Sequence, residues 1–185
     1  MNKDDRRFKK TEKALCRALS ELVEEKPIFK ITIDELVDRA DIHRSTFYTH
    51  YQDIYDLYNT LKDSFFDAMV KNVKEETSHD YTGQYASCVN FLEENKWLAR
   101  LFLGKNADSE VSRQLGEFLK EQILAISAFE DHVSEIPASW HYLCAYDAGG
   151  IIALLRYWVS NDFQFDKEEL VQLMIKLDAA FDNSF

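Results

Sequence analysis

Residues that interrupt helices are scarce in this sequence. Its 185 residues include only two prolines, Pro27 and Pro137, and five glycines. Proline removes a backbone donor and glycine costs conformational entropy in a helix, so few positions oppose helix formation. No segment shows the sustained alternation of apolar and polar residues that is typical of strands. The sequence therefore predicts an all-α protein.

Long apolar runs are also absent. No run approaches the roughly 18–20 residues that span a bilayer, and the charged N-terminus lacks the apolar segment of a signal peptide. We therefore expect a cytoplasmic protein with no membrane partner. The three cysteines, Cys16, Cys88 and Cys144, are odd in number and far apart, which favours buried thiols over a disulfide framework or a zinc site.

Signatures of catalysis are missing as well. The sequence contains no glycine-rich phosphate loop, no nucleophile elbow and no metal-binding His-Glu motif. His141 and Cys144 are three residues apart, but such a pair is a weak metal site without further ligands. We therefore expect no enzyme activity, no cofactor and no metal.

What the sequence does contain is a distinctive stretch over residues 31–51. Thr32 and Glu35 have the spacing of a capping box, in which each side chain bonds the other residue's backbone at the start of a helix. The apolar residues that follow recur on one side of that helix, at Ile33, Leu36, Val37 and Ala40.

The second helix of this stretch is expected from His43 to Thr49, and its outer face carries small polar side chains. Phe47 faces inward, whereas Ser45 and Thr49 project from the opposite side. Hydroxyl groups and a neighbouring arginine suit phosphate oxygens and base edges. Two helices with a short turn, of which the second presents such groups, fit a DNA-binding helix-turn-helix. An ordinary helical hairpin at the surface is the alternative.

A specific pattern extends over roughly residues 6–60. It is carried by Ile31-Thr32-Ile33-Asp34-Glu35-Leu36, Ala40, Ser45-Thr46-Phe47-Tyr48-Thr49-His50-Tyr51 and Leu57. This pattern resembles the DNA-binding signature of TetR/AcrR-type transcriptional regulators. Asp41 stands at the turn where that family usually has glycine, so an aspartate must adopt the left-handed conformation. Ile54 stands where the family usually has a phosphate-contacting lysine.

The resemblance implies an all-helical fold of about nine helices in two parts. We predict a helix-turn-helix DNA-binding domain of three helices over residues 1–56 and a helical effector-binding and dimerisation domain over residues 57–185. Phe8 is expected on the buried face of the first helix, and Phe29 in the core of the three-helix domain. Outside the motif, helices are expected near residues 5–25, 53–76, 137–160 and 166–181, with three more between the middle two.

Candidate DNA contacts lie mostly in the second helix of the motif. Base edges are expected to be read by Arg44, Ser45, Thr46 and Thr49. Phosphate contacts are expected from Thr32, Tyr48, His50 and a basic N-terminal arm that includes Arg6. His43, at the start of the helix, is a further candidate. The cations of the arm can equally belong to a solvated terminus.

The net charge of −11 is unevenly distributed. Residues 1–56 carry 11 Lys and Arg against 12 Asp and Glu, whereas the remaining residues carry 11 against 21. A DNA-binding part with so little net basicity depends on a few well-placed cations. We therefore expect moderate affinity for DNA and a modest salt dependence.

Small residues line one side of the helix expected over residues 137–160. Ala145, Gly149 and Ala153 are spaced by four, and Gly150 is adjacent. A helical glycine costs about 1 kcal/mol relative to alanine, which favours close approach by another backbone. That approach is either intramolecular or by a second copy, and TetR-like proteins pair through their last two helices. We predict a homodimer with an interface at Ala145, Gly149, Ile152, Ala153, Arg156, Leu173 and Leu177.

Large apolar side chains in the second part either line a small-molecule pocket or fill a core. The pocket candidates are Phe65, Met69, Tyr85, Phe102, Phe118 and Trp140. The acidic charge of this part favours a neutral or cationic effector over an anion.

These patterns together predict a homodimeric transcriptional regulator that binds a palindromic operator in double-stranded DNA. A ligand-responsive repressor is expected rather than an activator. The alternative is a TetR-like co-activator or adaptor that binds a protein partner or a metabolite, with weak or no DNA binding. A helical protein that only sequesters a ligand is a third interpretation.

Overall fold

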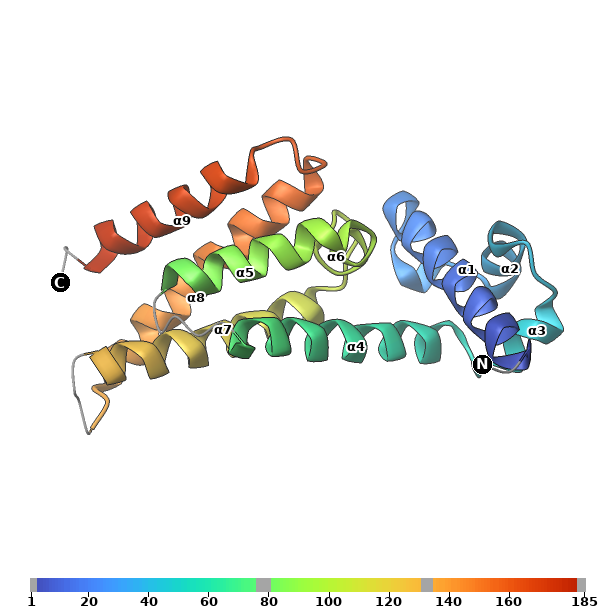
Figure 1. Cartoon of the computed structure of the whole chain (residues 1–185), viewed down its shortest axis with the longest axis horizontal. Coiled ribbons are helices and arrows are strands. Elements are labelled where there is room, and N and C mark those ends of the chain that lie inside the picture. Colours follow the sequence, from blue (N-terminus) through green and yellow to red (C-terminus); the bar gives the residue numbers. More distant parts are fainter. Residues whose placement is uncertain (1–2, 76–80, 131–134, 183–185) are drawn as a thin grey trace.

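The computed structural model describes residues 3–75, 81–130 and 135–182, and all regular structure in these residues is helical. Figure 1 shows an elongated molecule with a small helical unit at one end and a helical bundle at the other. The nine α-helices of the described residues confirm the predicted fold class. None of these helices combines the length and the apolar character that a bilayer span requires.

The small unit, called the head below, is built from α1, α2 and α3. Its elements are α1 (Lys3–Glu25), a short 3₁₀ helix (Ile28–Lys30), α2 (Ile33–Ala40) and α3 (Arg44–Tyr48). α1 packs against α2, and α3 lies at the outer end of the molecule (Figure 1). The core between these helices contains the buried side chains of Leu15, Leu19, Leu22, Leu36, Val37 and Phe47.

Two aromatic side chains of the head differ from the sequence-based expectation. Phe8 is exposed, and its ring stacks on that of His50 with centroids 4.2 Å apart. Phe29 is 70% exposed and does not enter the three-helix core. The 3₁₀ helix has three residues per turn, so Ile28 and Ile31 share one side and are both buried, which leaves Phe29 on the outside.

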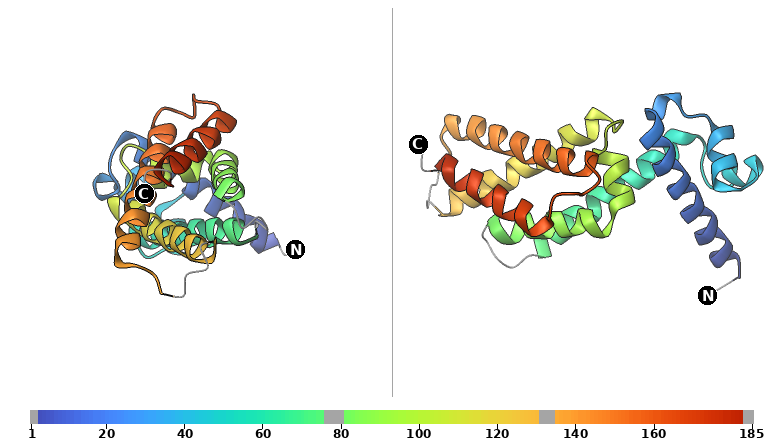
Figure 2. Two further views of the ribbon diagram at one scale, coloured as in Figure 1. Left: turned by 90° about the vertical axis from the view of Figure 1, so that its left-hand side faces the viewer. Right: turned by 90° about the horizontal axis from the view of Figure 1, so that it is seen from above.

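The remaining helices form the body of the molecule. They are α4 (Ile54–Glu75), α5 (Tyr81–Glu94), α6 (Lys96–Leu103), α7 (Ser109–Glu130), α8 (Ala138–Ser160) and α9 (Lys167–Asp182). α4 leaves the head and runs along the bundle, so one helix belongs to both parts (Figures 1 and 2). Pro137 precedes α8 as its N-cap instead of being its first helical residue, because its ψ of 143° is extended.

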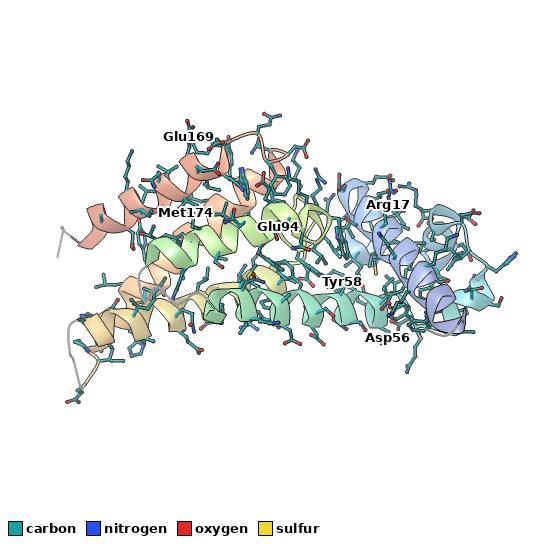
Figure 3. The ribbon with its side chains drawn as sticks, viewed as in Figure 1. Arg17, Asp56, Tyr58, Glu94, Glu169 and Met174 are labelled. Atoms are coloured by element: carbon teal, nitrogen blue, oxygen red, sulfur yellow. The ribbon has the colours of Figure 1, made fainter. Side chains whose placement is uncertain are left out.

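Aromatic rings fill the core between α4, α5 and α6. The ring of Phe65 lies 5.7 Å from that of Phe91 and 5.0 Å from that of Phe102. Tyr58 projects from α4 toward α6, where its ring is 5.3 Å from Phe102 (Figure 3). Met174 of α9 is also buried (Figure 3).

α1 packs against α6, and polar groups near the end of α1 add hydrogen bonds between the head and the body. The hydroxyl of Ser20 donates to the carbonyl oxygen of Trp97 at 2.8 Å. The side-chain amide of Asn106 donates to the carbonyl oxygens of Val23 and Glu24, both at 3.0 Å. Because the last carbonyls of a helix have no partner within it, Asn106 stabilises the C-terminus of α1 from the body.

Arg100 joins three parts of the molecule at this junction. Its Nε lies 3.7 Å from Oε1 of Glu24 in α1, and its Nη2 lies 2.5 Å from Oδ1 of Asp162 in the α8–α9 turn. The guanidinium also lies 5.4 Å from the ring centroid of Phe163. Asp162 and Phe163 have φ values of 58° and 57°, a conformation that costs free energy for non-glycine residues. The contacts around Arg100 help to hold this turn in place.

Candidate nucleic-acid interface

The start of α2 is fixed by the capping box expected from the sequence. The backbone N–H of Glu35 donates to Oγ1 of Thr32 at 3.3 Å, and the backbone N–H of Thr32 donates to Oε2 of Glu35 at 2.9 Å. The side chain of Lys26 forms an ion pair with the same carboxylate. α2 therefore begins at a defined residue, which sets the start of the helix-turn-helix.

The turn between α2 and α3 depends on Asp41. This residue has φ 54° and ψ 51°, so the left-handed conformation predicted for it is confirmed. Its backbone N–H donates to the carbonyl oxygen of Asp38 at 3.2 Å, and that of Ile42 donates to Val37 at 3.1 Å. These bonds close the end of α2 and redirect the chain into α3.

α3 is short, and one residue anchors it. It comprises only five residues, too few for a helix that is stable alone. Phe47 is fully buried in the head core, with its ring 5.5 Å from that of Tyr48 and 6.1 Å from that of Tyr51. The anchoring of Phe47 leaves the outer part of α3 and its two cap residues at the surface, where the exposed residues are His43, Arg44, Ser45, Tyr48 and Thr49.

Arg44 is held in place although it is exposed. Its Nη1 lies 2.5 Å from Oδ1 of Asp34 in α2, and its Nη2 donates to the hydroxyl of Tyr48 at 3.3 Å. The hydrogen bond with Tyr48 and the ion pair with Asp34 raise the pKa of Arg44 above its ordinary value. The cation therefore has a defined direction on the surface.

The other candidate side chains differ in their exposure and in the hydrogen bonds that they form within the protein. The hydroxyl of Thr49 donates to the carbonyl oxygen of Thr46 at 2.6 Å, which closes the end of α3. His50 is half-buried beneath Phe8, and Thr46 is also half-buried. Ser45 is exposed at the surface of α3.

The basic N-terminal residues belong to α1 rather than to an extended arm. The helix begins at Lys3, so residues 6–10 are helical. The side chain of Arg6 lies outside the described residues, whereas those of Lys9 and Lys10 are exposed. Ile54, at the position of the family's usual lysine, is buried in the core and contributes no charge.

A second exposed surface lies on α8 and α9. A groove of about 860 Å³ between these helices is lined by Ala145, Gly149, Ala153 and Leu177, among others. A methyl group added at Gly149 or Gly150 would meet nothing within 4 Å in the described chain. Gly149 and Gly150 therefore do not serve a close contact within the described part of this protomer.

The family is decided by the second part of the chain. Residues 80–177, more than half of the sequence, match the family model TetR_C_8, described as "Transcriptional regulator C-terminal region". The chain belongs to the TetR family of transcriptional regulators. TetR-family proteins are regulators and not enzymes.

Relatives of this TetR-family protein cover nearly its whole length. The HTH-type dhaKLM operon transcriptional activator DhaS of Lactococcus lactis subsp. lactis (strain IL1403) is 22% identical over 173 residues, which are 89% of each chain. A TetR transcriptional regulator from Streptococcus agalactiae 2603V has a TM-score of 0.68 at 20% identity, covering 94% of this chain and 96% of that one. FadR from Bacillus subtilis, solved with stearoyl-CoA, has a TM-score of 0.62 at 16% identity, covering 89% and 95%. At these identities the structures show the common fold.

The residues expected at the dimer interface of this TetR-family protein differ in their exposure. Ala145, Gly149, Ala153 and Leu177 are exposed, and Arg156 and Leu173 are half-buried. Ile152 is buried within its own protomer, because it turns toward the body core with Ile151 and Leu155.

The expected pocket residues lie mainly in the core of the body. Phe65, Met69, Tyr85 and Phe102 are buried, whereas Phe118 and Trp140 are half-buried. The ring contacts of Phe65 with Phe91 and Phe102 agree with the alternative that these side chains pack a core.

The contact of Asp34 with Arg44 on this surface was not predicted from the sequence. Its position in the first turn of α2 is explained by the helix dipole alone. The ion pair with Arg44 connects residues ten positions apart across the turn, and no helical spacing rule covers such a pair. Only the placement of α3 against α2 brings the two side chains together.

Proposed function

We propose that this TetR-family regulator binds a palindromic operator in double-stranded DNA as a homodimer, with one α3 in the major groove of each half-site. The observation that carries the proposal is the exposed face of α3, where Arg44, Ser45 and Thr49 stand outward over the buried anchor Phe47. Arginine pairs with guanine, and hydroxyls pair with several base edges. Tyr48, His50, Thr32 and the first turns of α1, which include Arg6, are the phosphate contacts of this proposal.

The two copies of α3 must meet one duplex together. Half-sites on one face of DNA are about 34–36 Å apart, or a multiple of that distance. The elongated shape puts α3 at one end of each protomer, far from α9 (Figure 1). A dimer through α8 and α9 leaves both heads free to reach the DNA.

A mobility-shift assay with DNA from upstream of the protein's own gene tests this function. We expect a saturable shift that an unrelated duplex does not compete away. A complex that unrelated DNA removes at equal concentration would contradict sequence-specific binding. Reporter expression with and without the protein then separates repression, which we propose, from activation.

Two variants separate base contacts from phosphate contacts. Arg44→Ala should relax discrimination at one base pair of each half-site, at a cost of roughly 1–3 kcal/mol. Tyr48→Phe removes the hydroxyl and should weaken binding to unrelated DNA as well as to the operator. Unchanged base preference in Arg44→Ala, or a loss confined to the operator in Tyr48→Phe, would reject the respective assignment.

The proposed regulation is by a small-molecule effector in the body. FadR of Bacillus subtilis was solved with stearoyl-CoA, so this fold can hold a large ligand. The proposed site is lined by Phe65, Met69, Tyr85, Phe102, Phe118 and Trp140. An effector would favour the dimer state in which the two heads no longer match the operator. Loss of the mobility shift on addition of one metabolite, with the dimer intact, is the expected result.

An adaptor function is the second candidate, and three observations favour it. The head has little net positive charge, and Ile54 is buried where relatives usually present a lysine. The relative DhaS is moreover a transcriptional activator. If the upstream DNA gives no shift while the protein still activates a reporter, the adaptor function replaces direct repression.

A further inference from the structure

Asp34 and Arg44 form a pair on the outer face of the head. Nη1 of Arg44 lies 2.5 Å from Oδ1 of Asp34. On its other side, Arg44 donates to the hydroxyl of Tyr48 at 3.3 Å, and its guanidinium carbon lies 5.7 Å from the centroid of the same ring. Two partners from two different helices therefore restrain one exposed guanidinium.

Stability does not explain this pair well. The side chain of Arg44 is 54% exposed and that of Asp34 is 68% exposed. Ion pairs with such exposure contribute little to folding, since water screens them and ordering the side chains costs entropy. A carboxylate on a surface that faces DNA also repels phosphates, which lowers affinity. The helix dipole accounts for an acidic residue at this position, but the pairing of Asp34 with Arg44 needs a reason other than folding or general affinity for DNA.

The chemistry of arginine supplies that reason. Arginine reads guanine through two parallel hydrogen bonds, which require the plane of the guanidinium to have one orientation. A free arginine side chain samples many rotamers and loses that freedom on binding. The guanidinium of Arg44 is already held at one edge by Asp34 and lies over the ring of Tyr48. It therefore loses fewer rotamers when it binds a base, and it still has N–H groups to donate.

We infer that Asp34 is a positioning residue, which orients the guanidinium of Arg44 for one base pair of each half-site and so contributes to operator specificity. This inference rests on the proposed DNA-binding function. Asp34 does not itself touch the base. In the competing arrangement, Arg44 leaves Asp34 on binding and pairs with a phosphate, and Asp34 then only reduces affinity.

The variant Asp34→Asn separates these two arrangements. It keeps the shape of the side chain and removes its charge. Binding is measured by fluorescence anisotropy to the operator, to duplexes with each single base-pair change, and to an unrelated duplex. We expect discrimination at the base pair read by Arg44 to fall about fivefold or more, the low end for one arginine–base contact. Binding to unrelated DNA should become slightly tighter, because a negative charge has been removed.

Asp38→Asn is the matched control. Asp38 lies one turn further along α2, is exposed and carries the same charge. This variant should tighten binding to unrelated DNA in the same way and leave base discrimination unchanged. In an Arg44→Ala background, Asp34→Asn should cause no further loss of discrimination.

A measurement without DNA tests the orientation itself. Relaxation of the side-chain Nε of Arg44, measured by NMR, should show faster and wider motion in Asp34→Asn than in the wild type. Equal motion would overturn the inference even if no operator has been found. Tighter binding of Asp34→Asn to every duplex, with unchanged base preference, would also overturn it and favour the phosphate arrangement. Absence of any sequence preference in the wild type would instead refute the proposed function, and the inference with it.

Discussion

The side chain of Glu35 accepts three hydrogen bonds at the start of α2, from Lys26 and from Thr32. Hydrogen bonds from Lys26, from the backbone N–H of Thr32 and from the hydroxyl of Thr32 lower the pKa of the Glu35 carboxyl to about 2. The carboxylate is partly exposed, so solvent screening keeps its contribution to stability small. The Glu35 carboxylate nevertheless belongs to the capping box that fixes the beginning of the helix-turn-helix.

The first prediction concerns the pH dependence of this contribution. Because the folded pKa lies below the ordinary value of 4.5, the charged form stabilises the fold above pH 4.5, and this stabilisation is lost as the pH falls from 4.5 to about 2. Urea unfolding of wild type and Glu35→Gln should therefore show a difference in unfolding free energy that shrinks across this window. A difference that is constant from neutral to acidic pH would contradict the assigned partners.

The second prediction concerns the thiols. Cys16, Cys88 and Cys144 are all buried thiols that form no disulfide, as the sequence predicted. Burial raises the pKa of Cys16 and of Cys88 to about 12, so the reactive thiolate is rare at mildly alkaline pH. We expect a thiol-specific chromogenic reagent to react in native buffer only as fast as the chain opens, and at once in denaturant. Rapid labelling of one thiol in native buffer would show that its surroundings open locally.

At the scale of elements, the sequence predicted what local spacing determines. The Thr32–Glu35 spacing located the start of α2, and Asp41 was correctly expected in the left-handed conformation. Phe29 was misplaced because its direction depends on a 3₁₀ helix that the apolar pattern does not reveal. The contact between Asp34 and Arg44 was missed because it forms only once α3 has docked on α2.

The third prediction tests the role of the glycines in α8. Gly149→Ala should stabilise an isolated helix by about 1 kcal/mol, and no atom of the described chain opposes the added methyl group. If the close approach is by a second copy, the same change should weaken the dimer. Gly116→Ala in α7 is the control, since Gly116 is also helical and has nothing within 4 Å of an added methyl group.

Sedimentation equilibrium and thermal unfolding at several protein concentrations distinguish the outcomes. We expect Gly149→Ala to raise the dimer dissociation constant and Gly116→Ala to leave it unchanged. Equal stabilisation by both changes, with an unchanged dissociation constant, would place the interface elsewhere on the protomer.

At the scale of the whole molecule, the head is attached to the body in two ways. α4 passes covalently from one into the other, and α1 docks on α6 and on the α6–α7 loop through Ser20, Asn106 and Arg100. The second attachment combines apolar packing of α1 against α6 with these hydrogen bonds and an ion pair, and its polar contacts can exchange partners at low cost. The ion pair between Arg100 and Asp162 further links this docking site to the α8–α9 turn.

The fourth prediction concerns this junction. Arg100→Ala removes the ion pairs with Glu24 and Asp162 and the contact over Phe163, but it leaves the buried core intact. We expect the melting temperature to fall by less than about 4 °C. Amide hydrogen exchange should rise selectively at the end of α1 and in the α8–α9 turn, because both lose their shared partner.

Arg113→Ala is the control for Arg100→Ala, because within the part of the chain that the structure describes Arg113 pairs with Glu110 of its own helix. Its exchange pattern should match the wild type outside α7. Operator affinity should fall in Arg100→Ala and not in Arg113→Ala, since a head with a less defined orientation binds a fixed half-site spacing with a larger entropy cost. If Arg100→Ala leaves exchange at the end of α1 unchanged, then Ser20 and Asn106 suffice to dock the head, and Arg100 serves only the α8–α9 turn.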